Sequence, residues 1–213
     1  MGKFYRFFLT TLTPLLKVVF PTKLVGKNLI ADGKCLAVCN HLSAMDPVVL
    51  AYKVYRKEFH GPSKAELFVE KHKLRGKFLR AIGAIPISRG ETDVAAFKEI
   101  VNLLMANKPV CFFPEGTRNK RGEDVLLPLK KGVATFAIKT KSQVQPFFLY
   151  KKPRVFRKNY LFVGEPFTLD AFYGNRSSDA MHEATCYITQ KMLELREDVL
   201  RYMKDKKDVK KWL

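Results

Sequence analysis

The sequence predicts an α/β fold: a single domain with a mainly parallel central sheet flanked by helices, preceded by an N-terminal membrane-interface helical segment. Short apolar runs alternate along the chain with amphipathic stretches, an order typical of βαβ units. The 213 residues are 47% hydrophobic and 28% charged, which suits one globular domain with its own core. No run of ~20 uncharged apolar residues occurs, so we expect no ordinary transmembrane helix.

The elements follow one another in an alternating order. Five short apolar runs are predicted as strands, at Cys35–Cys39, 84–87, 109–113, 144–150 and 161–163. Helices are predicted from residue 46 onward and at 74–82, 92–106, 132–141 and 177–203, before a mixed-charge tail at 204–211. The first of these begins at Asp46, whose side chain can cap it, with Pro47 at the first helical position. We find no internal repeat and no linker, so residues 22–213 are predicted to form one domain.

Residues 1–21 form a distinct segment that is rich in aromatic and aliphatic side chains. Pro14 interrupts it and Pro21 ends it, and no acidic residue precedes Asp32. A secretory signal peptide is a poor match, because the small-residue cleavage site is missing. Apolar bulk beside cations is typical of a helix, or two short helices, lying in a membrane interface. The alternative is a helix packed on the protein's own core.

The basic surplus is the unusual feature of the composition. The formal net charge is +19, so the partner is expected to be acidic: nucleic acid, an anionic membrane or a phosphorylated small molecule. Residues 125–164 hold nine Lys or Arg and no acid, and residues 71–90 hold six and no acid. The four cysteines form no C-x-x-C pair and are interpreted as reduced thiols, with no zinc site.

The first candidate catalytic group lies directly after the strand predicted at Cys35–Cys39. Asn40 and His41 are followed five positions later by Asp46. The carboxyl ends of strands are where open α/β sheets build their sites. An imidazole can take a proton from an alcohol, and a carboxylate on its other nitrogen would fix the tautomer. The alternative is that Asp46 only caps its helix and His41 is an ordinary loop residue.

A second polar group follows the strand predicted at 109–113. Pro114 ends that strand, and then Glu115, Gly116, Thr117 and Arg118 are presented together. Arg can bind a phosphate with two hydrogen bonds, and Gly allows a close approach of backbone amides. The alternative is a plain turn. No G-x-x-x-x-G-K-[ST], G-x-G-x-x-G or G-x-S-x-G motif occurs.

Together these blocks resemble the glycerolipid acyltransferases of the bacterial 1-acylglycerol-3-phosphate (lysophosphatidic acid) acyltransferase type. The likeness covers about residues 27–167 and runs through four blocks in the family's order: the N-H-x4-D motif ending at Asp46, the stretches 63–68 and 83–89, the stretch 113–118 with 129–132 after it, and 144–146. Two positions depart from the family pattern. Ser88 stands where Asp usually precedes the arginine, and Asn119 stands where Ser is common.

The resemblance implies a role for each matching position. His41 would be the general base and Asp46 its partner. The acceptor phosphate would be bound by Lys64, Arg89 and Arg118. The loop around that phosphate would be shaped by Glu115, Gly116 and Thr117, and Pro146 would lie near the acyl path.

The activity implied by the resemblance is transfer of a fatty acyl chain to the sn-2 hydroxyl of 1-acylglycerol-3-phosphate, which gives phosphatidic acid for phospholipid biosynthesis. The donor would be acyl-CoA or acyl carrier protein, and no cofactor or metal is expected. The expected place is the cytoplasmic face of the cell membrane, as a peripheral or monotopic protein on anionic lipid. Glycerol-3-phosphate or another lysophospholipid is an alternative acceptor. A basic nucleic-acid-binding module is the alternative from another class, but it explains only the charge.

Overall fold

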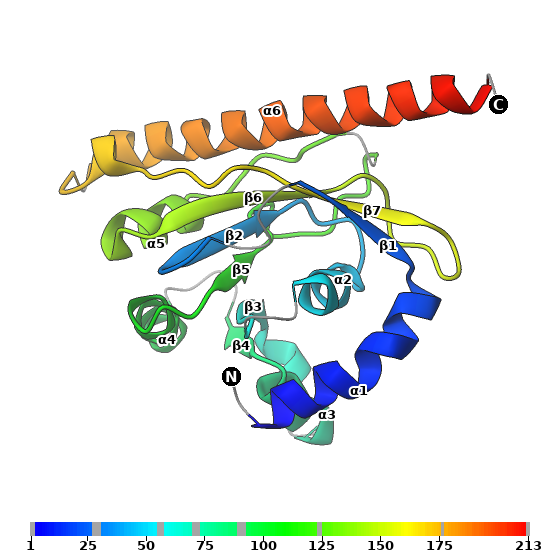
Figure 1. The fold of residues 1–213 in the computed structure, drawn as a ribbon. Coiled ribbons are helices and arrows are strands. Elements are labelled where there is room, and N and C mark those ends of the chain that lie inside the picture. Colours follow the sequence, from blue (N-terminus) through cyan, green and yellow to red (C-terminus); the bar gives the residue numbers. More distant parts are fainter. Residues whose placement is uncertain are drawn as a thin grey trace.

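The computed structural model describes residues 3–26, 31–54, 58–69, 73–88, 93–122, 125–175 and 177–211. A five-stranded sheet lies at its centre in the order β1-β7-β6-β2-β5 (Figure 1). Its strands are β1 (Thr22–Val25), β2 (Cys35–Cys39), β5 (Val110–Phe112), β6 (Gln143–Leu149) and β7 (Asn159–Val163). β2 is parallel to both β5 and β6, and β1 is parallel to β7, whereas β6 and β7 are antiparallel. The prediction of a mainly parallel central sheet is confirmed.

A second, two-stranded parallel sheet continues the first one. It contains β3 (Gly61–Lys64) and β4 (Ala84–Ile87). His60, just before β3, forms a parallel bridge with Val110 of β5 and accepts a hydrogen bond from the Cys111 N–H at 2.7 Å. The strands β6, β2, β5, β3 and β4 therefore run side by side in the same direction, and their carboxyl ends share one edge. Strands β1 and β3 were missed by the sequence analysis, because neither shows an apolar run.

Helices cover both faces of the sheet. They are α1 (Lys3–Val19), α2 (Asp46–Lys53), α3 (Lys73–Ala81), α4 (Val94–Met105), α5 (Gly132–Thr140) and α6 (Ser178–Lys211), with 3-10 turns η1 (Ala65–Phe68) and η3 (Asp170–Phe172). Leu36 and Val38 of β2 pack in one core cluster with α4, α5 and α6, whereas Ala37 and Cys39 pack in another with α2. This alternation follows from the two-residue period of a strand, and it gives a three-layer α/β/α domain. In Figure 1, α6 crosses one face of the sheet, and α1 and α2 lie on the other.

Two helices differ from the prediction. α1 is one continuous helix that passes through Pro14, although the sequence predicted an interruption there. Proline removes one N–H from the interior, but the flanking turns still pack: Tyr5 and Phe20 are buried against the domain. α6 continues to Lys211 where a tail was predicted after residue 203, and Val199 and Met203 are buried beside β7. Within the described residues, no helix combines the length and hydropathy that a membrane span requires.

The turn at Gly83 brings β4 beside β3, so we expect it to tolerate no side chain. Gly83 has φ +88°, and a Cβ there would lie 2.1 Å from the Phe59 carbonyl oxygen. Gly33 offers a matched control, because it has φ +82° and no neighbouring atom within 4 Å of the same Cβ position. We predict that Gly33→Ala lowers the free energy of unfolding by about 1–2 kcal/mol, the cost of the left-handed conformation. Gly83→Ala should cost at least ~2 kcal/mol more in chemical denaturation. Equal losses in the two variants would contradict this account of the turn.

Candidate active site

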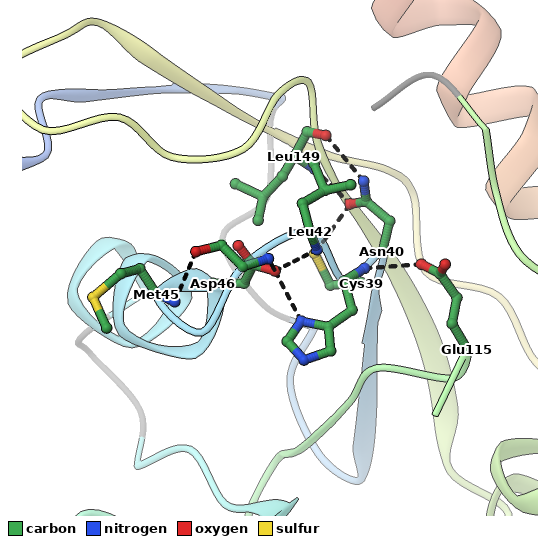
Figure 2. A network of polar contacts seen from close by, with 9 residues as sticks. Cys39, Asn40, Leu42, Met45, Asp46, Glu115 and Leu149 are labelled. Carbon is green, nitrogen blue, oxygen red and sulfur yellow. Dashed lines mark hydrogen bonds and ion pairs between the residues drawn. The ribbon is translucent and has the colours of Figure 1, made fainter. Parts of the chain in front are cut away.

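His41 and Asp46 lie in the connection between β2 and α2, at the carboxyl edge of the sheet. The Asp46 side chain is fully buried, and its Oδ2 accepts a hydrogen bond from the His41 ring Nδ1 at 2.8 Å. The same oxygen accepts the N–H groups of Leu42 at 2.6 Å and Ser43 at 2.7 Å. Figure 2 shows Asp46 at the start of α2 with its carboxylate turned back towards this loop. The predicted capping role is wrong, since the helix has no side-chain cap and the carboxylate binds the preceding turn instead.

This geometry fixes the tautomer of His41. A carboxylate oxygen that already accepts two backbone N–H groups is an acceptor, so the Nδ1 of the imidazole must carry a proton and donate it. The other ring nitrogen, Nε2, then has a free lone pair when the ring is neutral. The Phe113 ring stacks on the imidazole with centroids 4.3 Å apart, and the His41 side chain keeps 19% of its exposure. An imidazole held in this way can accept a proton at Nε2.

Asn40 anchors the strand end that carries His41. Its side chain is buried and pairs with the Leu149 backbone in β6, accepting the N–H at 2.8 Å and donating to the carbonyl at 3.0 Å. This amide extends the ladder between β2 and β6 by one pair beyond Cys39 (Figure 2). Asn40 belongs to the N-H-x4-D motif, but its role could not be predicted from the sequence, because its partner Leu149 lies more than a hundred residues away.

Glu115 ties the second polar group to the first. Its side chain is buried, and its carboxylate accepts the His41 N–H at 2.8 Å and the Leu127 N–H at 3.3 Å. The His41 carbonyl in turn accepts the Asn119 N–H at 2.6 Å. Burial raises the pKa of the Glu115 carboxyl, and the two backbone N–H bonds act in the opposite direction. The two loops therefore form one connected unit (Figure 2).

The loop beyond Glu115 carries exposed polar side chains. Gly116 has φ +67°, and a Cβ there would lie 2.7 Å from Cε of Lys130, so the lysine stem lies directly over this glycine. The Pro114 carbonyl accepts the Lys130 N–H at 2.9 Å, which holds the two segments together. Thr117 and Arg118 are exposed at the same turn. Lys130 is a cation beside this loop to which the sequence analysis assigned no role, although it lies in the third block.

Of the other residues predicted to belong to the site, Lys64 is exposed, Pro146 is buried and Arg89 is not described. Lys64 ends β3, is exposed, and stands opposite Ile87 in the parallel register with β4. Arg89 lies outside the described residues, so its convergence with Lys64 and Arg118 stays a prediction. Pro146 is buried within β6 opposite Val38 of β2, and its proximity to the acyl path also stays a prediction.

No metal-binding group was predicted. Among the residues that the structure describes, no cluster of three or more His, Cys, Asp or Glu side chains could hold a metal ion.

Comparison with known proteins identifies the family. The family model described as Acyltransferase matches residues 22–150, more than half of the chain. The chain belongs to this acyltransferase family. Over 198 residues, the acyltransferase is 31% identical to the 1-acyl-sn-glycerol-3-phosphate acyltransferase of Bacillus subtilis (strain 168), covering 90% of this chain and 96% of the relative. It is 33% identical to the protein of the same name from Helicobacter pylori (strain J99) over 135 residues, 61% of this chain and 54% of the relative.

A solved structure supports the fold of the acyltransferase. The crystal structure of the 1-acyl-sn-glycerophosphate acyltransferase PlsC from Thermotoga maritima matches with a TM-score of 0.61 at 21% identity. The match covers 91% of this chain and 77% of that one. The predicted membership of the glycerolipid acyltransferases is confirmed, and the chain is an enzyme of the acyltransferase class.

We predict that Glu115 stabilises the acyltransferase through its two backbone partners. Glu115→Ala leaves the N–H groups of His41 and Leu127 without their acceptor, so the free energy of unfolding should fall by about 1–3 kcal/mol. The control is Glu165→Ala, which removes an exposed carboxylate and should change stability by less than ~0.5 kcal/mol. Urea denaturation checks both. A loss no larger than that of the control would show that the two loops hold together without Glu115.

Proposed function

We propose that this acyltransferase moves a fatty acyl chain from acyl-CoA or acyl carrier protein to the sn-2 hydroxyl of 1-acylglycerol-3-phosphate, giving phosphatidic acid. The observation that carries the proposal is the His41 ring bonded to a buried carboxylate, while the His41 backbone N–H bonds Glu115 in the loop that presents Arg118. Relatives that match over most of the chain bear the name 1-acyl-sn-glycerol-3-phosphate acyltransferase. Both donors carry a thioester and acidic groups, and both suit a chain with a net charge of +19.

The proposed reaction is a direct transfer. The His41 Nε2 takes the proton of the acceptor hydroxyl as the oxygen attacks the thioester carbonyl carbon. The new C–O bond forms, the C–S bond breaks, and the thiolate leaves and takes the proton back from the imidazolium. Asp46 stabilises the imidazolium while it exists, because its negative charge lies 2.8 Å from Nδ1. General base catalysis of this kind contributes typically ~10²–10⁴-fold, and the remainder comes from holding the two substrates together.

The proposed acceptor site lies along the same edge of the sheet. Lys64 follows from β3 and Arg118 from β5, and these strands lie next to each other, so both exposed cations start from the carboxyl edge that also bears His41. Arg89, assigned by the family resemblance, would be the third cation. Gly116 and Thr117 would shape the loop around the phosphate. A dianion bound here would be neutralised by charge-assisted hydrogen bonds.

The proposed location is the cytoplasmic face of the cell membrane, reached through residues 1–21. α1 buries one side against the domain and exposes another: Phe7, Leu15 and Val18 are 67%, 57% and 64% exposed. These three residues recur at helical spacing on one face, with Arg6 and Lys17 at its border. An apolar helix face bordered by cations supports peripheral or monotopic binding to anionic lipid. The side that packs on the domain means that α1 contributes to the core as well.

The first prediction here concerns the base. His41→Ala should lower kcat at least ~100-fold, from the usual size of general base catalysis, while the melting temperature stays near that of the wild type. Asp46→Asn should also impair turnover, because a neutral amide lacks the negative charge that stabilises the His41 imidazolium. His182→Ala, an exposed histidine on α6, is the matched control and should leave turnover unchanged. Full activity in the His41 variant would refute the assignment.

The second prediction concerns the acceptor phosphate. Arg118→Ala should lower kcat/KM for 1-acylglycerol-3-phosphate by about 10–100-fold, the worth of one charge-assisted contact of roughly 1.5–3 kcal/mol. Arg118→Lys should recover only part, because it keeps the charge and loses the planar fork. Lys120→Ala removes a nearby exposed cation and should have a much smaller effect.

A panel of acceptors completes this test. Monoacylglycerol, which has no phosphate, should be a poor acceptor for the wild type and should lose little more in the Arg118 variant. If losses on the two acceptors are equal, Arg118 holds the loop rather than the phosphate. Faster turnover of glycerol-3-phosphate or of another lysophospholipid would replace the proposed acceptor.

A further inference from the structure

The connection between β6 and β7 has an unusual sequence and exposure. It runs from residue 150 to residue 158, and its tip presents Val155 at 50% and Phe156 at 70% exposure. The cations that flank this apolar pair are Lys151, Lys152, Arg154, Arg157 and Lys158. No acidic residue occurs anywhere in 125–164. More than half of the cations in this acid-free stretch therefore surround one exposed apolar tip.

This connection is held in a defined shape. The buried Asn159 side chain accepts the Arg154 N–H at 2.8 Å and donates to the carbonyls of Arg154 at 3.1 Å and Arg157 at 2.9 Å. The Phe156 N–H donates to the Val19 carbonyl at the end of α1, at 2.7 Å. Four backbone groups are thus fixed around a ring that makes little contact with the protein. The exposure of Phe156 is a consequence of the fold, and a loose loop does not explain it.

The backbone of Phe156 is also strained. Its φ is +55°, the left-handed region that disfavours residues with a Cβ and is adopted more readily by Asn and Asp. A buried aromatic ring could offset that cost by packing, but this ring is turned to solvent. A strained conformation that holds an apolar side chain outward points to a partner outside the chain.

The tip lies at the catalytic edge of the sheet. β6 is parallel to β2, so the segment that follows β6 leaves the sheet at the same edge as His41. In Figure 1 the β6–β7 connection and the end of α1 lie close together at one end of the molecule. The hydrogen bond between Phe156 and Val19 joins the tip to the helix that exposes Leu15 and Val18.

We propose that the β6–β7 tip is a second docking element for an anionic bilayer, with Phe156 and Val155 entering the interface and the flanking cations contacting lipid phosphates. An apolar tip surrounded by charges of a single sign complements a surface that offers both acyl chains and negative headgroups. The choice of a bilayer rests on the proposed function, because a lysophospholipid acceptor and its product reside there. Together with α1, the tip fixes the orientation of the domain, so that the edge with His41 faces the headgroups.

The decisive variant is Phe156→Asn in the full chain. Asparagine tolerates φ +55° better than phenylalanine, so the melting temperature should stay equal or rise, while binding to vesicles of equal parts phosphatidylglycerol and phosphatidylcholine should weaken about tenfold. The matched control is Met105→Ser, because Met105 is 55% exposed at the end of α4, before the amino end of β5 and so at the opposite edge. Its vesicle binding should stay within about twofold of the wild type.

The contribution of the flanking cations is tested with the double variant Arg154→Glu and Arg157→Glu. Binding to the mixed vesicles should fall by about tenfold or more, with little change on pure phosphatidylcholine, since each cation near an anionic surface contributes roughly fivefold. Lys98→Glu with Lys139→Glu changes the net charge by the same amount at α4 and α5, and its loss should be much smaller. The docking element would be overturned if Phe156→Asn bound vesicles as well as the wild type does. It would also be overturned if the two double charge variants lost equal amounts of vesicle binding.

Two further outcomes are also decisive. A lower melting temperature of Phe156→Asn would make the ring a structural residue and would overturn the proposal. The vesicle measurement requires no turnover, so it is independent of the acceptor assignment. A wild type that binds through Phe156 but does not acylate 1-acylglycerol-3-phosphate would overturn the proposed function and leave the docking element in place.

Discussion

A single buried carboxylate oxygen organises the site. Oδ2 of Asp46 accepts the His41 Nδ1–H and the N–H groups of Leu42 and Ser43, so one atom closes the turn after β2 and orients the imidazole. A buried carboxylate is costly unless it is hydrogen-bonded, and three donors offset that cost at Oδ2, whereas Oδ1 is buried without a hydrogen-bond partner among the described residues. The shape of the turn and the tautomer of the histidine are therefore two results of the same contacts. The start of α2 follows from the same atom, because the turn delivers the chain to Pro47.

The parallel direction of the strands brings the other segments of the site to the same edge of the sheet. β2, β5, β3 and β4 are neighbours and parallel, so the segments after them leave along one edge even though they are far apart in sequence. Glu115 connects two of these segments directly through the His41 N–H. Asn40 connects the first to β6. The edge is thus one hydrogen-bonded unit supported by a packed sheet, which is the rigid support that a catalytic constellation requires.

The sequence predicted much of this fold, and the misses have physical causes. Buried strands such as Cys35–Cys39 are continuous apolar runs and can be recognised without knowing their neighbours. β1 and β3 cannot be recognised in this way, because their short sequences mix polar and apolar residues and become strands only through partners distant in the chain. The spacing of His41 and Asp46 allowed a contact, but capping was equally consistent with it until the backbone was known. Glu115 and Lys130 were in view as motif residues, yet their partners depend on how two loops fold over each other.

The position of β1 constrains how the chain is assembled during synthesis. Among the described strands β1 forms its ladder with β7 alone, and Thr22 lies opposite Asn159, so more than half of the chain must leave the ribosome before this pairing can begin. Contacts of such long sequence separation form late. Over that interval Phe20 and the last turn of α1 lack the β6 and β7 residues of their core cluster, Phe147 and Leu161, and stay open to lipid or to a chaperone. The first helix made is therefore among the last parts to be locked into the native structure.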